Sequence, residues 1–325
     1  EFDRLPATAG AVYIVGRTQL NLHTAKIRGM AESGQYVMVF SNPAEGSETL
    51  DGHLHRHGIR DLVRQGQLRC IAGGDMPLDL NCLIYEHFLT QPERYSENAR
   101  ARQEFEQYWT APVKPYQFLF LNGRARPHRT ALIQQLGSLL DHALWSCLDG
   151  PHVQTLPRDY EYPWFAGREV DNQGWVKPAL FDNLWGEIYL HAPAYRDTYF
   201  SLVTETVFDF SYSFRTEKIW KPIAIGHPWI AATNAGFYRD IHDLGFKTFG
   251  HLIDESFDSI DNPQDRIERI ATVVEDLCQQ DLDKFAVAAR EVCVYNQQLH
   301  TELSSKIYNE FPEKFSQFLN ERFRI

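Results

Sequence analysis

The sequence lacks the features of a membrane protein, a nucleic-acid coat protein or a disulfide-rich secreted domain. It has no run of 18 apolar residues, so no membrane span is expected. Lys and Arg number 32 against 43 Asp and Glu, the opposite of a surface that neutralises phosphates. The five cysteines are scattered without a Cys-x-x-Cys pair, as is typical of free thiols in a reducing compartment. We therefore expect a cytoplasmic protein, and nucleic acid is not an expected partner.

Metal-site signals are also scarce. The one Asp-x-Asp sequence, Asp281 with Asp283, stands at the start of a predicted helix in the tail, where it predicts helix capping. His53, His55 and His57 alternate, but no neighbouring pattern of Cys or carboxylates completes a zinc site. We predict no metal site and no cofactor.

The length of 325 residues is typical of two domains, and a hydrophobic content of 43% supplies a large core. Over residues 11–75, apolar runs typical of buried strands alternate with segments of helical spacing, which predicts an open parallel α/β sheet. A charged amphipathic helix is expected over 92–109. The two prolines within 110–115 then predict a domain boundary.

The same alternation predicts a second sheet, with strands over 116–123, 199–206 and 228–233 and a short strand over 246–250. Helical periodicity continues almost without interruption from residue 262. We therefore predict two Rossmann-like α/β domains, 1–112 and 113–262. A helical tail, 263–325, is expected to pack back partly on both domains.

Basic side chains follow the first strand of the second domain, in "FLFLNGRARPHRTALI" (118–133). Ligands of open α/β sheets bind beyond the carboxyl ends of the strands, and the free amides at a helix start favour anions there. Asn122, Arg124, Arg126 and Arg129 are thus candidates to bind a phosphate or diphosphate, which Arg grips in a bidentate way. The structural alternative is a solvated basic turn.

A second cluster follows the next strand, in "SLVTETVFDFSYSFRTEK" (201–218). A carboxylate such as Glu217 can accept hydrogen bonds from a ribose diol, and the ammonium of Lys218 can neutralise a departing diphosphate. Aromatic side chains in the loop can contact a base. Together with the Arg turn, these groups suit a nucleotide-diphosphate sugar.

The stretch "RTEKIWKPIAIGHPWI" (215–230) resembles the signature of α-1,3-fucosyltransferases and related GT-B glycosyltransferases, and also bacterial and phage glycosyltransferase-like proteins. The match covers about residues 199–260, with weaker support at 116–133. The resemblance implies that Glu217 binds the ribose and that Lys218 and Arg124 or Arg126 bind the pyrophosphate. Glu205 corresponds to a Glu that precedes the motif in that family. The candidate binding residues are Asn122, Arg124, Arg126, Arg129, Glu205, Tyr212, Phe214, Thr216, Glu217, Lys218 and Lys221.

The resemblance implies a GT-B-like, metal-independent and inverting glycosyltransferase that moves a sugar from a nucleotide-diphosphate donor to an acceptor hydroxyl. The acceptor, a glycan, a protein or a small molecule, would bind the N-terminal domain, with the chemistry in the cleft. Charge-stabilising groups such as Lys218 would face the leaving diphosphate. An inverting transfer needs a general base, for which Glu45 and then Asp75 are the candidates, since both follow predicted strands.

Two other functions remain open: a non-catalytic nucleotide- or glycan-binding module of the same fold, and a glycosyltransferase that acts on modified DNA bases. Consumption of the donor separates binding alone from transfer. The motif could also be an ordinary helix start, with Thr216 as N-cap and Glu217 in the first turn. Lys218 there opposes the helix dipole, so the sequence predicts that Lys218→Ala costs little stability.

Overall fold

The structure is a computed structural model that describes residues 12–42, 50–73, 80, 82–93, 96–110, 113–160 and 189–320. It divides into two compact units: unit 1, Glu1–His87 with Lys306–Ile325, and unit 2, Phe88–Ser305. Each unit contains one four-stranded parallel sheet. The predicted α/β class with two separate sheets is therefore confirmed. Within the described ranges, no helix combines the length and apolar character needed to cross a membrane.

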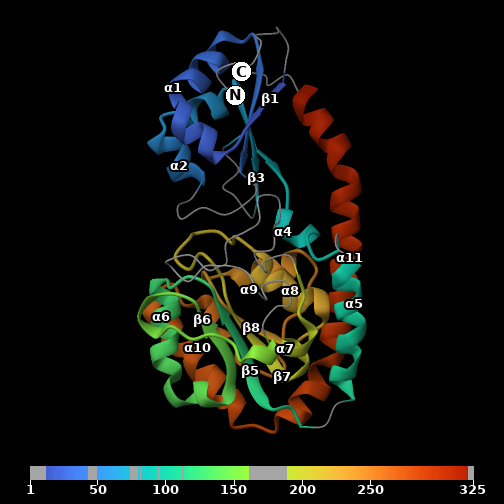
Figure 1. Cartoon of the computed structure of the whole chain (residues 1–325). Coiled ribbons are helices and arrows are strands. Elements are labelled where there is room, and N and C mark those ends of the chain that lie inside the picture. Colours follow the sequence, from blue (N-terminus) through green and yellow to red (C-terminus); the bar gives the residue numbers. More distant parts are fainter. Residues whose placement is uncertain are drawn as a thin grey trace. The chain divides into compact units, whose positions relative to one another are not determined.

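The sheet of unit 1 follows chain order, β1-β2-β3-β4 (Figure 1). The middle strands β2 and β3 bury apolar side chains on both faces, as is typical of parallel sheets, whereas Val12 and Ile14 on β1 are exposed. Phe40, Leu54 and Leu68 are fully buried in its core. The elements are β1 Val12–Val15, α1 Arg17–Ser33, β2 Val37–Asn42, α2 Leu50–Arg56, α3 Arg60–Arg64, β3 Leu68–Ala72 and β4 Cys82–Ile84.

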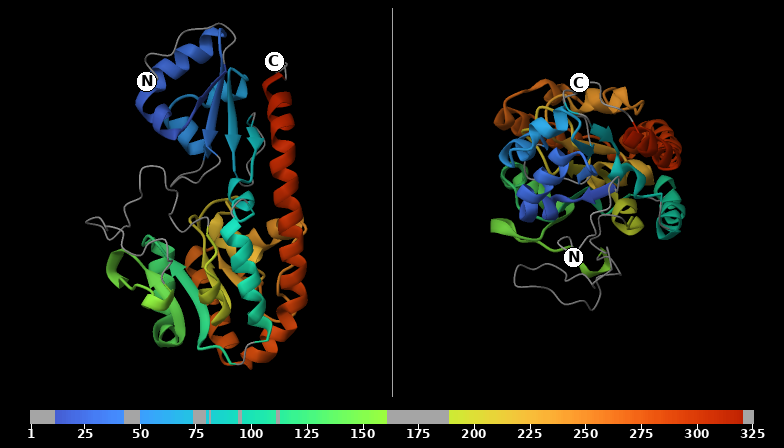
Figure 2. Two further views of the ribbon diagram at one scale, coloured as in Figure 1. Left: turned by 45° about the vertical axis from the view of Figure 1, so that its right-hand side comes forward. Right: turned by 90° about the horizontal axis from the view of Figure 1, so that it is seen from above.

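The last helix, α11 (Leu282–Asn320), contributes to both units, because its residues from Lys306 onward belong to unit 1. There the ring of Phe311 lies 4.4 Å from that of Tyr85, and Arg69 lies 5.8 Å from the ring centre of Phe318. The end of this helix therefore forms part of the packing of unit 1 (Figure 2).

The division between the units falls at His87, earlier than the boundary expected near residue 112. The reason lies in α5 (Ser96–Phe105) and the 3-10 helix η2 (Glu106–Trp109). Both pack against α7 (Ala192–Arg196) of unit 2, and α5 also packs against α8 (Glu217–Ile225). Tyr108 Oη donates to the carbonyl oxygen of Tyr199 at 2.7 Å. Residues 110–115, with their two prolines, lie between two segments of unit 2. The turn that they predict is therefore not the division between the two units.

In unit 2 the strand order is β6-β5-β7-β8, with β5 Tyr116–Asn122, β6 Ala143–Cys147, β7 Thr198–Thr204 and β8 Trp229–Ala232. The predicted strands around 116–123 and 199–206 belong to one sheet, as expected, and are neighbours in it, with Phe118 paired to Phe200. From β5 the chain goes first to the edge strand β6 and then returns to β7 on the other side. The direction of strand addition therefore reverses between β5 and β7, which makes this point the topological switch of the sheet.

Helices cover both faces of this sheet (Figure 1), and α6 packs against α10 while α5 packs against α7 and α8. The remaining elements are α4 His87–Thr90, α6 Pro127–Leu136, η3 Gly137–His142, η4 Gly150–His152, η5 Arg158–Tyr160, α7 Ala192–Arg196, α8 Glu217–Ile225, α9 Phe237–Asp243, η7 Ser256–Ser259 and α10 Pro263–Cys278.

Helix α8 begins and ends where local chemistry requires. Thr216 is the N-cap, and its Oγ1 accepts a hydrogen bond from the amide of Lys218. Ile219, Trp220 and Ile223 bury its apolar face. Gly226 ends the helix at φ 83°, a conformation that favours glycine. The buried His227 follows, and its Nδ1 and Nε2 contact Ser201 Oγ and the carbonyl oxygen of Thr198 at 2.9 and 3.0 Å.

The strand expected over 246–250 is not formed, although Phe246 and Phe249 are fully buried as a strand would require. Side chains satisfy the backbone there in place of a neighbouring strand. Asn296 on α11 accepts a hydrogen bond from the amide of Lys247 and donates one to its carbonyl oxygen, at 2.9 and 2.8 Å. Periodicity alone therefore identified a buried segment but misassigned its backbone.

Candidate functional site at the switch point of the second sheet

The carboxyl ends of β5 and β7 meet at the switch point and form the floor of the candidate site. Thr204 Oγ1 donates a 2.6 Å hydrogen bond to Asn122 Oδ1, and both residues are buried. The other amide atom, Asn122 Nδ2, is buried and has no hydrogen-bond partner among the described residues. An unsatisfied buried donor is costly, so this amide is an unusual feature of a folded protein.

The start of α6 is tied to the end of β7. His128 Nε2 donates to the carbonyl oxygen of Glu205 at 2.9 Å, and its ring is stacked on Phe208 at a centroid distance of 5.0 Å. Arg129, which is almost fully buried, donates to the carbonyl oxygens of Arg124 and Thr204 at 2.9 and 3.1 Å. These contacts place the Arg129 guanidinium in the wall of the site, where it connects the loop after β5 to the end of β7.

The side chain of Glu205 binds Thr216, the N-cap residue of α8. Its side chain is 0% exposed, and Oε1 and Oε2 accept hydrogen bonds from the amide and the Oγ1 of Thr216 at 3.0 and 2.6 Å. Burial raises the pKa of Glu205, and the charge of Lys218 and the Thr216 hydrogen bonds offset that effect in part. A fully buried carboxylate bonded in this way positions the N-cap of the helix and is not open to a ligand.

Lys218 lies at the centre of the site, with its ammonium bent back over the helix start. Its Nζ donates to Glu217 Oε1 at 2.7 Å and to the hydroxyls of Thr206 and Thr216, each at 3.1 Å. The side chain of Lys218 is 23% exposed and that of Glu217 is 14% exposed. The ammonium is therefore held among three oxygen atoms, and this geometry predicts that its removal costs stability, contrary to the expectation from the helix dipole.

The electrostatics of the site favour an ionised carboxylate beside a neutral imidazole. Burial would raise the pKa of Glu217, but Lys218 and then Lys221 lower it below its ordinary value. Burial and the charges of Arg129, Arg126 and Lys218 lower the pKa of His128 to about 3. His128 is therefore neutral at pH 7 and surrounded by cations. The positive charges of Arg126, Arg129 and Lys218 around the neutral His128 would favour a bound anion.

Two further arginines stand at the loop between β5 and α6. Arg126 is the N-cap residue of α6 and is half-buried. Its Nε is buried, and no described residue is its hydrogen-bond partner. Arg124 is exposed. Arg126 therefore combines a preset position, a helix N-terminus and unused hydrogen-bonding capacity, which are the properties of an anion-binding group.

The remaining candidate side chains differ in their access to a ligand. Tyr212 is half-buried and lies 5.4 Å from Phe210, between ring centroids. Phe214 is buried, and its ring meets that of Phe88 edge to face at 6.5 Å. Lys221 is buried one helical turn after Glu217. Of the two aromatic candidates, Tyr212 is therefore the one with surface to offer a base.

The proposed general bases, Glu45 and Asp75, lie outside the described residues. Within the described ranges, no group of three His, Cys, Asp or Glu side chains is arranged to bind a metal ion. The Asp-x-Asp sequence is structural, as expected, because Asp281 Oδ1 accepts from the amide of Lys284 and Asp283 accepts from Tyr199 Oη at 2.9 Å.

Sequence reasoning missed His128 and Thr206. The signal for His128 was present, since it is the second residue of a helix that begins just after a strand and an Arg turn, in "RARPHR". Thr206 gave no signal, because its role depends on the distant ammonium of Lys218.

Comparison of the chain with protein-family models, with curated proteins and with solved structures gave no match. The fold defines a two-unit parallel α/β protein with an anion-compatible site at the switch point of its second sheet. The resemblance to α-1,3-fucosyltransferases rests on the motif around Thr216–Lys218 and stays a prediction.

Proposed function

We propose that this protein is a glycosyltransferase of the GT-B type, which transfers a sugar from a nucleotide-diphosphate donor to an acceptor hydroxyl. One observation carries the proposal. The switch point brings Arg126 at the start of α6 and the Glu217–Lys218 pair at the start of α8 to the same end of the sheet. Open α/β sheets bind nucleotides at such points, and each helix start favours an anion.

In this proposal the donor binds by an exchange of contacts. Lys218 replaces its 2.7 Å contact with Glu217 by one with a diphosphate oxygen, and the released carboxylate accepts hydrogen bonds from the ribose hydroxyls. Arg126 binds the same diphosphate through its fork of donors. The acceptor oxygen then attacks the anomeric carbon, and the carbon–oxygen bond to the diphosphate breaks. The diphosphate keeps the electron pair, and the hydroxyl proton passes to a base.

The cationic side chains supply the charge that the leaving diphosphate needs, so we propose that the transfer is metal-independent. The proposal that it is inverting rests on the resemblance to α-1,3-fucosyltransferases alone. Removing one preorganised charge-stabilising group costs about 100-fold or more in turnover. Lys218→Ala is therefore expected to reduce turnover by roughly that factor at saturating donor. Turnover should persist in a chelator, and its complete loss with recovery on adding Mg²⁺ or Mn²⁺ would contradict this account.

The sharpest test separates the contributions of the two helix starts to binding. Titrate wild type, Arg126→Met and Glu217→Gln with UDP, GDP, ADP and inorganic pyrophosphate, using calorimetry. Arg126→Met should weaken both the preferred nucleotide and pyrophosphate by about tenfold or more, because it removes a phosphate contact. Glu217→Gln should weaken the nucleotide and leave pyrophosphate unchanged, because it acts on the ribose.

Arg239→Met is the matched control, because Arg239 is 73% exposed and lies outside the site. A nucleotide affinity that is equal in all four proteins would contradict the site. Binding with the expected pattern but without donor consumption in the presence of acceptor hydroxyls would limit the function to nucleotide binding.

A further inference from the structure

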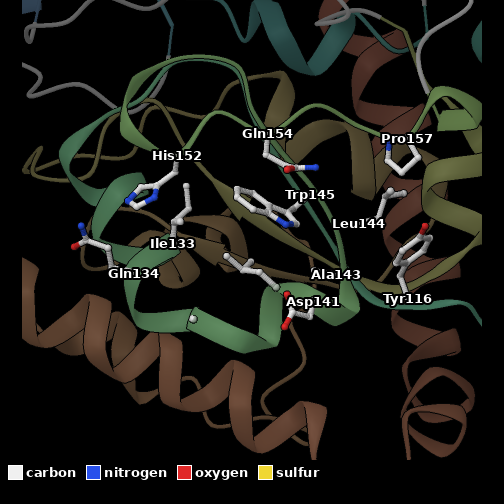
Figure 3. Close-up of a pocket in the computed structure, with 12 residues that line it drawn as sticks. Tyr116, Ile133, Gln134, Asp141, Ala143, Leu144, Trp145, His152, Gln154 and Pro157 are labelled. Carbon is white, nitrogen blue, oxygen red and sulfur yellow. The ribbon is translucent and has the colours of Figure 1, made fainter.

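A second concave site lies on the edge strand of unit 2, away from the switch point. The cavity has a volume of about 590 Å³ and is lined by β6, the end of α6, η3 and residues 152–157 (Figure 3). That volume is in the range of small-molecule sites. None of the candidate residues at the switch point lines it. Its strand residues, Ala143–Trp145, lie in the amino-terminal part of β6, whereas the switch-point site lies beyond the carboxyl ends of the strands.

Regular secondary structure and backbone hydrogen bonds fix the wall of the cavity. Residues 153–155 fold back along the end of β6, where Cys147 and Gln154 exchange two backbone hydrogen bonds of 2.8 Å. Leu144 is buried, as are Ile133 and Leu140. The apolar floor and the polar rim are therefore fixed by the sheet and by α6.

Trp145 lies in the middle of the lining, with His152 and Ile133 toward one end and Leu144 and Tyr116 toward the other (Figure 3). Trp145 and Tyr116 are half-buried, so each offers part of an aromatic surface to a ligand. His152 Nε2 is buried and has no hydrogen-bond partner in the part of the chain that the structure describes, which leaves one donor or acceptor for a bound molecule.

The polar groups of the rim are neutral or acidic. Gln134, Asp141 and Gln154 are exposed at the lining, and none of the twelve described residues that line the cavity is Lys or Arg. Among these residues a phosphate or carboxylate would meet Asp141 without a compensating cation, so an anionic ligand is disfavoured. Amide and carboxylate side chains can instead donate to and accept from hydroxyl groups.

We propose that this cavity binds a neutral sugar ring of a glycan, at a site separate from the switch point. A pyranose has an apolar face of C–H groups that packs on an aromatic side chain, and a rim of hydroxyls that amide and carboxylate groups bind. Trp145 supplies the face, and Gln134, Asp141 and Gln154 supply the rim. A nucleotide would add a charged phosphate, for which the described lining offers no Lys or Arg.

The test uses neutral trisaccharides as probes: maltotriose, cellotriose, N-acetylated chitotriose and β-1,4-galactotriose. Binding is measured on the full chain by saturation-transfer NMR and by tryptophan fluorescence at up to about 10 mM sugar, since single-pocket sugar sites are expected to be weak. At least one trisaccharide should bind, and a galacturonic-acid trisaccharide should bind less well than the neutral galactose form. Uridine and adenosine are the competing probes.

Trp145→Ala should weaken the bound trisaccharide by about tenfold or more, because it removes the central aromatic contact. Trp109→Ala is the matched control, since Trp109 is a half-buried tryptophan outside the cavity. The rim variants Gln134→Ala and Asp141→Ala change exposed side chains and test the same site if Trp145→Ala does not fold.

No binding by any of the four neutral trisaccharides would overturn the proposal. It would also be overturned by tighter binding of a nucleoside in the same cavity, or by binding that Trp145→Ala and both rim variants leave unchanged. These outcomes are independent of nucleotide binding at the switch point, so each proposal can fail while the other holds.

Discussion

The contacts of Lys218 predict a clear stability defect when its charge is removed. Lys218→Met keeps a long unbranched side chain but loses the ammonium, which donates to three oxygen atoms within 3.1 Å. Its carboxylate partner Glu217 is 14% exposed and would be left without that contact. A hydrogen bond to a charged group contributes about 1.5–3 kcal/mol, and partial exposure reduces the effect. We expect the free energy of unfolding to fall by about 2 kcal/mol at pH 7, or roughly 4–8 °C in Tm.

The pH dependence gives this prediction a distinct signature. In the wild type, nearby cations hold the pKa of Glu217 below its ordinary value although burial opposes them. Glu217 therefore adds stability above its unfolded pKa, and that stability is lost as the pH falls through the folded value. In Lys218→Met, burial still disfavours the charged form of Glu217, while the attraction from nearby cations is weaker. The pKa of Glu217 should therefore rise above its wild-type value. The penalty of the variant is then largest near neutral pH and shrinks as the pH falls below about 5.

Urea unfolding of the wild type and Lys218→Met at pH 7 and pH 4.5 measures both effects. Lys284→Met is the matched control, because Lys284 also pairs with an acidic side chain but is 85% exposed. We expect the control to match the wild type at both values of pH. The reasoning is refuted if Lys218→Met is as stable as the control at pH 7, or if its deficit is the same at both values.

Three other substitutions test the packing of unit 2, each by urea unfolding. Burial lowers the pKa of His227 to about 3. The free energy of unfolding of the wild type should therefore fall as the pH drops below 6.5, by about 2 kcal/mol at pH 5 for this one group. That of His227→Gln should fall less over the same range. Asn296→Ala should cost about 1–3 kcal/mol, because it leaves both backbone groups of Lys247 without their partner, whereas the exposed Asn320→Ala should cost little. Arg266→Lys should cost about 2 kcal/mol, since Arg266 donates to four carbonyl oxygens that a Lys cannot reach together, and an unchanged midpoint would contradict that account.

The secondary structure around the site could be predicted because its signals are local. Helix α8 begins at a Thr N-cap, buries side chains at helical spacing and ends at Gly226, all within one short stretch of sequence. The strands β5 and β7 are rich in apolar and aromatic side chains, as is typical of buried parallel strands. Their alternation with helices determined the α/β class, and their carboxyl ends correctly indicated where polar side chains gather.

The roles of individual side chains were decided by tertiary structure, because their partners are remote in the chain. Arg129 and Thr204 are 75 residues apart, yet the hydrogen bond between them gives Arg129, a candidate phosphate ligand, a structural role. Glu205 is fully buried beneath Thr216, which no local pattern indicates. The sequence by itself determined most of the elements around the candidate site and the end of the sheet where its polar side chains gather. Which charges face a ligand depended on hydrogen bonds and burial that exist once the strands have assembled.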